Sequence, residues 1–252
     1  MKAIGDVNGD GYDDVAFSNP YEGIPGLDGR GQTVVHSGPN LTSLYTLTGT
    51  ATYQVLGYSV DRFDDVDNDG LPDLLLSDAN EITIRSGLSG AILSQTPFPP
   101  YLALPKPINA GDLDRDGVSD ILFADHYASN GLATEAGTVW AISGANQSLL
   151  HLVTSEKQWD WYGKFLDRAG DVNGDGHDDF LVGSSFGTST SGKHTDLFSG
   201  RDGSLLHQWS PDFDSRFSAF DANANINGGR SIEFIHGSGW TDIGTFTDAG
   251  LV

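Results

Sequence analysis

Aspartate and asparagine side chains recur at alternate positions in four nine-residue segments of the chain. The segments read DVNGDGYDD, DVDNDGLPD, DLDRDGVSD and DVNGDGHDD, at residues 6–14, 65–73, 112–120 and 171–179. Each has an oxygen-bearing side chain at positions one, three, five and nine and a glycine at position six. A tight loop can turn such side chains inward onto one point, and glycine permits the sharp turn because it has no Cβ.

This arrangement of hard oxygen atoms predicts binding of Ca²⁺, which takes six to eight oxygen ligands at roughly 2.3–2.6 Å. We expect about four ions, one per loop, each held by side chains at positions one, three, five and nine and by the backbone carbonyl at position seven. The predicted ligands are Asp6, Asn8, Asp10, Tyr12, Asp14, Asp65, Asp67, Asp69, Leu71, Asp73, Asp112, Asp114, Asp116, Val118, Asp120, Asp171, Asn173, Asp175, His177 and Asp179. The His177 side chain itself is expected to point to solvent.

Position twelve separates these loops from EF-hand and dockerin loops, which need a bidentate acid there. The residues at that position are apolar in all four copies: Phe17, Leu76, Phe123 and Val182. Position nine must therefore supply the closing carboxylate.

The composition limits the possible partners. The formal charge is −22, and 14 of the 35 acidic side chains lie at the alternate loop positions, so the acidity is mainly a property of the predicted metal sites. A strongly negative surface argues against nucleic acid and anionic membranes as partners. No apolar run approaches the roughly 20 residues that span a bilayer, so no membrane insertion is expected. The absence of cysteine excludes disulfides and thiolate zinc sites.

Short apolar runs that accompany each loop predict β-strands. One set of strands is expected directly after the loops and a second set before a recurring Ser-Gly pair. Further strands are expected after that pair, as at 91–93 and 204–206, and before the next loop, as at 57–60 and 163–166. The first two sets lie at 15–17, 74–76, 121–123 and 180–182, and at 33–35, 82–84, 138–142 and 196–198. Loop starts are 59, 47 and 59 residues apart, and four strands in such a period are the content of one β-propeller blade.

A fifth, degenerate copy at 225–233 has Gly229 in place of the central acid and Arg230 in place of the glycine, so little or no metal binding is expected there. The predicted fold is therefore all-β, a β-propeller of about five four-stranded blades in a single domain over residues 1–252. The first loop follows Met1 without a signal peptide, and the chain stops before a fifth blade closes. We therefore expect an incomplete propeller or a fragment.

The loop, the strand after it and the blade-sized period resemble the FG-GAP repeats of integrin α-subunit propellers and their bacterial relatives. The family's Phe-Gly before the loop corresponds to Leu56-Gly57 and Tyr162-Gly163, and its Gly-Ala-Pro to Ser18-Asn19-Pro20 or Gly183-Ser184-Ser185. The resemblance implies structural calcium ions that clamp a hairpin loop at one end of each blade. Integrin propellers have seven blades, so a fragment of a larger, seven-bladed propeller stays an alternative.

The resemblance also implies a binding or adhesion module for a protein or carbohydrate rather than an enzyme. Weak calcium sites of this type are filled where calcium is millimolar, so an extracellular or cell-surface location is expected. Two alternatives stay open: a polysaccharide-active, lyase-like enzyme on the same scaffold, and a purely structural part of a larger surface protein.

Two clusters outside the loops could carry further chemistry. His126-Tyr127 could serve as general acid and base of a lyase if an arginine such as Arg62 or Arg168 bound the substrate carboxylate. A structural loop His and Tyr, with Asp-Arg salt bridges between blades, is the other interpretation of these residues. The aromatic stretch 159–162 could stack on sugars if exposed, although its place in a strand favours the core. An enzyme should bring His126, Tyr127 and an arginine together, whereas a binding module should show exposed aromatic side chains without such convergence.

Overall fold

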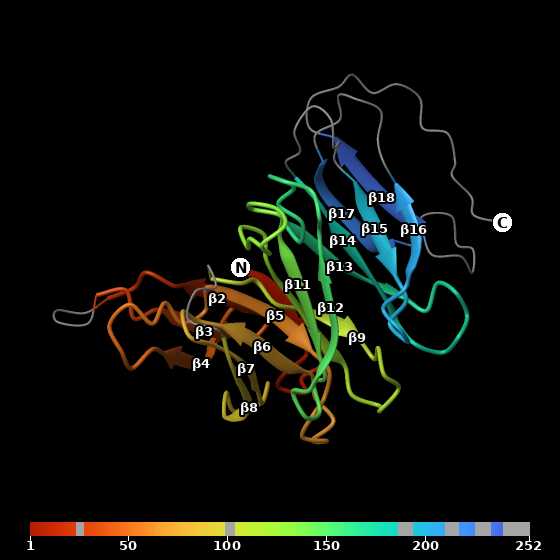
Figure 1. Cartoon of the computed structure of the whole chain (residues 1–252). Coiled ribbons are helices and arrows are strands. Elements are labelled where there is room, and N and C mark those ends of the chain that lie inside the picture. The colour runs from red at the N-terminus through yellow and green to blue at the C-terminus, as the bar shows by residue number, and fades with distance from the viewer. Residues whose placement is uncertain (24–27, 99–103, 186–193, 210–216, 225–232, 239–252) are drawn as a thin grey trace. The chain divides into compact units, whose positions relative to one another are not determined.

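The computed structural model describes residues 1–23, 28–98, 104–185, 194–209, 217–224 and 233–238 (Figure 1). Within these ranges the regular secondary structure consists of β-strands, which confirms the all-β prediction, and no helix is long and apolar enough to cross a membrane. The chain divides into two compact units, Met1–Asn109 and Ala110–Val252. Each unit is described by itself, and a single domain over the whole chain stays a prediction.

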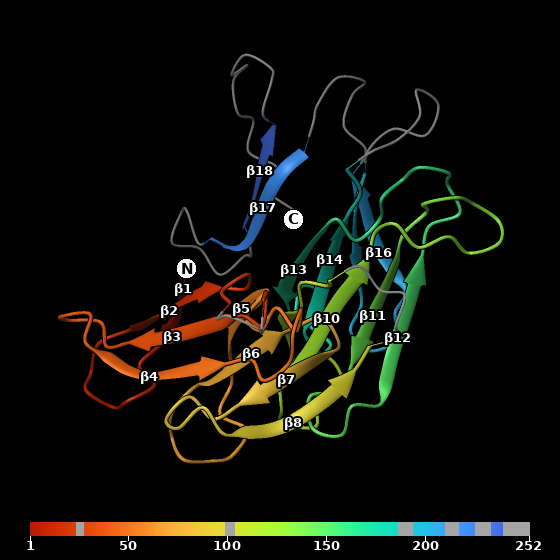
Figure 2. The same ribbon diagram turned by 90° about the vertical axis from the view of Figure 1, so that its left-hand side faces the viewer.

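Unit 1 contains two four-stranded antiparallel sheets in which neighbours in the sequence are also neighbours in the sheet (Figure 2). The first sheet consists of β1 (Lys2–Gly5), β2 (Asp14–Asn19), β3 (Gln32–His36) and β4 (Ser43–Thr48). The second consists of β5 (Ser59–Phe63), β6 (Asp73–Ser77), β7 (Glu81–Arg85) and β8 (Ile92–Pro97). β1 lies beside β5, so the two sheets pack against each other through their first strands.

The core of unit 1 lies between its two sheets. Every residue of β6 is buried, which explains why this strand reads as a continuous apolar run rather than an alternating one. The outer strands β4 and β8 are largely exposed or half-buried. The buried cluster joins β6 to the first sheet through Ile4, Val7, Ala16, Val35, Leu74 and Leu76.

The second half of the chain repeats this organisation. One sheet consists of β9 (Ile108–Gly111), β10 (Asp120–Asp125), β11 (Thr138–Ile142) and β12 (Leu149–Thr154), and the next of β13 (Phe165–Gly170), β14 (Asp179–Gly183), β15 (Thr195–Phe198) and β16 (Leu205–Trp209). β10 and β14 are buried along their whole length, like β6. Ala169, Leu181 and Leu197 form a buried cluster in the last sheet.

The two halves correspond position by position. Residues 6–73 and 112–179 align without a gap, 106 residues apart, and β1 to β6 begin at the positions that match the starts of β9 to β14. The repeating element is therefore a pair of sheets. Because equivalent backbones carry different side chains, each half serves as a control for the other.

The predicted blades are confirmed: four sheets, each of four consecutive antiparallel strands, make this a β-propeller fold. The strands fall where the apolar runs predicted them. The fifth repeat contributes the paired strands β17 (Phe217–Ala224) and β18 (Glu233–Ser238). Residues 225–232 of its degenerate loop lie outside the described residues, so the expectation of little or no metal there stays a prediction.

Gly137 gives a test of how closely the backbone packs in unit 2. It has φ +91°, and a Cβ there would lie 2.1–2.8 Å from the backbone of Tyr162. Gly137→Ala is expected to lower the free energy of unfolding by about 2 kcal/mol or more, because it adds a backbone clash to the strain of a positive φ. Urea denaturation measures the change. Gly131→Ala is the control, because Gly131 has φ +79° but open space around it, and should cost only about 1 kcal/mol. Equal losses would contradict the close packing.

Candidate metal centres

The four acidic loops are numbered 1 to 4 in chain order: 6–14, 65–73, 112–120 and 171–179. Each connects the first and second strands of its sheet and is organised by its own side chains. The first aspartate accepts hydrogen bonds from the backbone N–H groups of positions five and six. In loop 2, Asp65 Oδ1 accepts from Asp69 N at 3.1 Å and Asp65 Oδ2 from Gly70 N at 2.9 Å. The same two bonds occur in the other three loops. The loop therefore turns around its first carboxylate.

Positions three and five continue this inward arrangement. Asp67 Oδ1 accepts from Asp69 N at 3.2 Å, and Asp69 Oδ1 accepts from Leu71 N at 2.9 Å. The equivalent bonds recur in all four copies. Gly70 has φ +90°, and the other three glycines at position six have φ +87° to +91°. This value is accessible to glycine but strained for other residues, which explains the residue type.

The ninth aspartate links the loop to the rest of its sheet. Asp120 is fully buried, its Oδ2 accepting from Leu113 N at 2.7 Å and its Oδ1 from Gly144 N at 3.1 Å. Asp14, Asp73 and Asp179 make the same pair of bonds, each to position two and to the glycine of the Ser-Gly pair. This contact explains why the Ser-Gly pair recurs in step with the loops, a connection that the sequence alone did not disclose.

The donor atoms of the loops fit a calcium ion. Carboxylate oxygens of Asp65, Asp67 and Asp73 lie within 4.8 Å of one another, as do those of Asp112, Asp114 and Asp116. Two oxygens bound to the same Ca²⁺ at up to about 2.6 Å can be at most about 5.2 Å apart. The oxygens within each group are therefore close enough together to bind one ion. Loops 1 and 4 carry an amide oxygen at position three instead. The full ligand sets named above stay a prediction.

The aromatic stretch is divided between the core and the surface. Asp160 and Tyr162 are buried, Trp161 is half-buried and Trp159 is 38% exposed, so the expectation of a core stretch is right for Tyr162 and wrong for Trp159. The physical reason is the backbone: Trp159 and Trp161 have φ 58° and 49°, so this segment is not an extended strand. It is held instead by bonds from Trp159 N to Thr134 O and from Tyr162 N to Ala136 O.

His126, Tyr127 and Trp161 form an aromatic cluster in unit 2. Ring centroids are 4.1 Å apart for His126 and Tyr127 and 5.3 Å apart for Tyr127 and Trp161. Trp161 Nε1 donates to Glu135 Oε2 at 2.8 Å, and Lys164 Nζ lies 3.2 Å from His126 Nε2. In the described part of unit 2, a lysine therefore accompanies the His-Tyr pair. The Arg168 guanidinium pairs with Asp178 at 2.7 Å. Asp178 lies in the loop between β13 and β14, so this salt bridge lies within one blade and not between blades as predicted.

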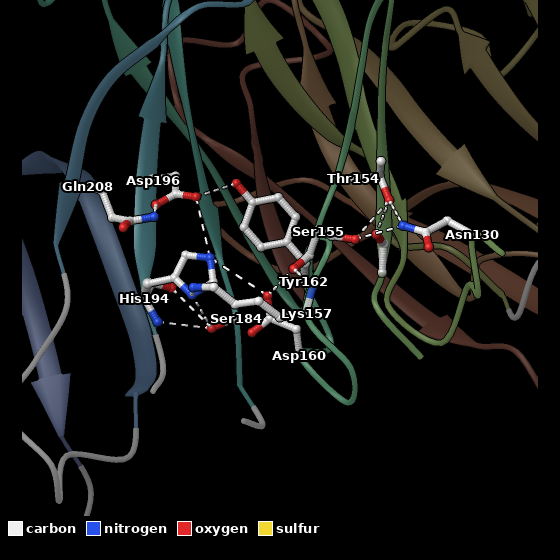
Figure 3. A network of polar contacts seen from close by, with 11 residues as sticks. Asn130, Thr154, Ser155, Lys157, Asp160, Tyr162, Ser184, His194, Asp196 and Gln208 are labelled. Atoms are coloured by element: carbon white, nitrogen blue, oxygen red, sulfur yellow. Dashed lines mark hydrogen bonds and ion pairs between the residues drawn. The ribbon is translucent and has the colours of Figure 1, made fainter. Parts of the chain in front are cut away.

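A buried polar network lies beneath the aromatic stretch (Figure 3). His194 Nε2 is 3.4 Å from Asp196 Oδ2 and 3.7 Å from Asp160 Oδ2, while its Nδ1 is 3.3 Å from Lys157 Nζ. Because a lysine ammonium only donates, Nδ1 accepts and Nε2 carries the hydrogen that faces the carboxylates. Burial raises the pKa of Asp160.

This network contains serine, histidine and aspartate, the residue types of a catalytic triad, but its hydrogen bonds serve the fold. Ser184 Oγ is buried and accepts from His194 N at 2.9 Å. Tyr162 OH donates to Asp196 Oδ2 at 2.7 Å, and Ser155 Oγ donates to Asp160 Oδ2 at 2.5 Å. The network thus fixes the segment that carries the tryptophans. Sequence reasoning missed it because its members, from Asn130 to Gln208 in Figure 3, are up to 78 positions apart and share no motif.

Comparison with protein families matches an FG-GAP-like repeat to residues 65–123 and an FG-GAP repeat to residues 3–36 and 168–200. These ranges cover half of the chain and contain all four acidic loops. The chain belongs to the FG-GAP repeat family.

Among its relatives, integrin alpha-V of Gallus gallus is 27% identical over 215 residues, and integrin alpha-5 of Xenopus laevis is 27% identical over 216 residues. Each match covers 75% of this FG-GAP chain, which spans only 20% of the length of either relative. The integrin-like family resemblance is thereby confirmed.

Two solved structures share the fold. The rhamnogalacturonan lyase YesW matches with a TM-score of 0.52 and 14% identity, over 93% of this chain and 54% of the lyase. BBS1N, solved in complex with ARL6DN, matches with a TM-score of 0.53 and 13% identity, over 81% of this chain and 55% of that chain. At these identities the similarity shows the fold alone.

The protonation of Asp120, the ninth residue of loop 3, changes with pH in an unusual range because the side chain is buried. Burial raises the pKa of Asp120 to about 7. The Asp114 and Asp116 carboxylates act in the same direction, and two backbone N–H bonds act against it. Between the ordinary value of 3.8 and about 7, the calcium-free folded protein binds a proton that the unfolded chain does not. This group's contribution to stability therefore decreases as the pH rises through that window.

An ion at loop 3 must displace this proton, so its affinity should fall below pH 7, approaching about tenfold per pH unit. Calcium titration at pH 8 and pH 6 tests this in a variant whose other loops are disabled by Asp10→Ala, Asp69→Ala and Asp175→Ala. The same variant with Asp116→Ala added is the control and should bind no ion. Equal affinities at the two pH values would show that Asp120 holds no proton there.

Proposed function

We propose that this FG-GAP propeller is a calcium-stabilised binding or adhesion module that works outside the cell or at its surface. About four Ca²⁺ ions occupy the acidic loops, and a protein or carbohydrate ligand binds to the aromatic cluster of unit 2. The observation that carries the proposal is the loop geometry, repeated four times with the same internal hydrogen bonds. The similarity to integrin alpha subunits supports the adhesion role.

The electrostatics of the loops support a structural role for the ions. Three carboxylates within a few ångströms repel each other, and a divalent cation reverses the sign of that interaction. The ninth carboxylate is buried, so desolvation raises the pKa of Asp73 and Asp179 as well as that of Asp120. A cation at the loop would offset the cost of keeping these groups charged. Calcium would therefore stabilise the contact between loop and sheet.

The aromatic cluster is the feature that supports ligand binding. Tyr127 is 45% exposed, and it lies beside a tryptophan that is oriented by a hydrogen bond to Glu135. Rigid aromatic rings next to polar groups are typical of sugar-binding surfaces and of protein-interface hot spots. The matching positions in unit 1 are Pro20, Tyr21, Gly29, Val55 and Tyr58. Only the tyrosine at 127 therefore has the same residue type in unit 1.

A lyase-like enzyme is the second candidate, favoured by the shared fold with a rhamnogalacturonan lyase and by the His126-Tyr127 pair. The described residues of unit 2 bring a lysine to this pair, whereas Arg168 is committed to Asp178 beside the acidic loop. This arrangement lacks the arginine expected of the enzyme. Release of unsaturated products from rhamnogalacturonan, followed by absorbance at 235 nm, would favour the enzyme instead.

Removal of calcium should destabilise the protein. A site contributes roughly 1.4 kcal/mol when free calcium exceeds Kd about tenfold, so four sites contribute about 5 kcal/mol. Excess chelator is therefore expected to lower the melting temperature by about 10–20 °C, and added calcium should restore it. Asp67→Ala and Asp114→Ala should each remove about one bound ion without unfolding the protein. A melting temperature that does not respond to chelator would rule out structural calcium.

Loss of the aromatic cluster should abolish ligand binding while leaving the calcium sites intact. A glycan array identifies a carbohydrate ligand, and calorimetry then compares variants. Tyr127→Ala and Trp161→Ala are each expected to weaken binding about tenfold or more, because a stacked ring contributes on the order of 1–3 kcal/mol. Tyr21→Ala, at the matching position of unit 1, is the control. If Tyr21→Ala weakens binding as much as Tyr127→Ala, the site is not in unit 2.

A further inference from the structure

Loops 3 and 4 are joined in unit 2 by a residue that is not among the predicted ligands. Asp178, at position eight of loop 4, accepts a hydrogen bond from Asp112 N at 2.9 Å, and Asp178 N donates to Asp112 O at 3.0 Å. Asp112 is the first predicted ligand of loop 3. Both backbone groups of that residue are thus bonded to the neighbouring loop.

A second bond lies next to the first. His177 Nδ1 is 2.6 Å from Leu113 O, and because a carbonyl only accepts, Nδ1 carries the hydrogen. The expectation that His177 points to solvent is therefore wrong: its ring is half-buried against loop 3. Its own carbonyl is a predicted ligand of loop 4. Three hydrogen bonds thus tie Asp112 and Leu113 of loop 3 to His177 and Asp178 of loop 4.

The ion pair with Arg168 keeps this link in place. The guanidinium donates to the same Asp178 oxygen that accepts from Asp112 N. The Asp178 charge is therefore neutralised locally and its side chain is held in one orientation. The link therefore joins the backbones of the two loops through one oriented side chain.

The equivalent place in unit 1 lacks these bonds. Pro72 stands where unit 2 has Asp178, and Leu71 stands where it has His177. Proline has neither a carboxylate nor an N–H group, and leucine has no polar side-chain atom. The arginine is retained: Arg62 lies beside Gly5, with its Cζ 3.3 Å from the position of an added Cβ. Loops 1 and 2 meet through Pro72 and Gly5 without the hydrogen bonds that join loops 3 and 4.

We infer that Asp178 is a positioning residue that makes the calcium sites of loops 3 and 4 cooperative, whereas those of loops 1 and 2 bind independently. An ion in loop 4 fixes the backbone on both sides of Asp178, through the His177 carbonyl and the Asp179 carboxylate. Asp178 then fixes the backbone of Asp112, so an ion in loop 3 loses less conformational entropy on binding. The effect is reciprocal between the two sites. This inference rests on the proposed calcium binding.

Calorimetric calcium titrations of the full chain test the inference in two matched backgrounds. Asp10→Ala with Asp69→Ala leaves loops 3 and 4, and Asp116→Ala with Asp175→Ala leaves loops 1 and 2. In the first background the second ion is expected to bind at least about five-fold more tightly than independent sites allow. In the second background the two ions should bind independently.

Two further variants test whether Asp178 is the source of the cooperativity. Asp178→Ala in the first background should leave two ions bound but remove the cooperativity. Pro72→Asp in the second background places a carboxylate beside Arg62 and Asp6 and should create cooperativity. Melting in excess chelator checks that each variant is folded. If Asp178→Ala does not fold, Asp178→Asn replaces it; it removes the charge paired with Arg168 and should reduce the cooperativity.

The possible failures are distinguishable. Independent binding at loops 3 and 4 in the first background would overturn the inference while leaving the calcium sites themselves in place. Equal cooperativity in both backgrounds would also overturn it, because Asp178 could not then be its source. No calcium bound to the unaltered chain would instead refute the proposed function.

Discussion

A buried carboxylate with two backbone N–H donors is the interaction on which this molecule depends. Each ninth loop aspartate joins the start of its own loop to the glycine of the Ser-Gly turn, so it fixes three strands of a sheet at one end. The same charge is costly to bury, and two hydrogen bonds offset only part of that cost. The fold and the predicted cation site therefore share this residue.

The pairing of sheets shows how one scaffold accommodates different side chains. In their described parts, residues 6–73 and 112–179 keep their strand starts at a constant offset, and the left-handed residues Tyr53 and Trp159 also match. Most positions differ in residue type between the halves, in the strands as well as in the loops, and every position of β3 differs from its counterpart in β11. Pro72 against Asp178 removes the hydrogen bonds between neighbouring loops, and Val55 stands where Trp161 donates a hydrogen bond to Glu135. The strands begin at matching positions in both halves despite these differences.

The strands and the loops could be predicted from the sequence because both depend on local patterns of residue types. Apolar runs such as 74–76 and 121–123 place the buried strands, and alternating acids place the turns. Contacts between distant residues could not be predicted in the same way. The bond from Asp120 to Gly144, the ring of His177 on Leu113 and the network around His194 depend on tertiary packing. The outward position of Trp159 depends on a positive φ that no local motif indicates.

The order of strands within each sheet has a consequence for biosynthesis. Each of the four four-stranded sheets uses strands that follow one another directly, so the first sheet is contained within Lys2–Thr48. Its contacts are short in sequence, which lowers the entropic cost of loop closure and favours rapid formation. The strands of the first sheet can thus pair before the next sheet has been synthesised, whereas the core of unit 1 forms only when β6 is added. The sheets can therefore form in the order in which they are translated.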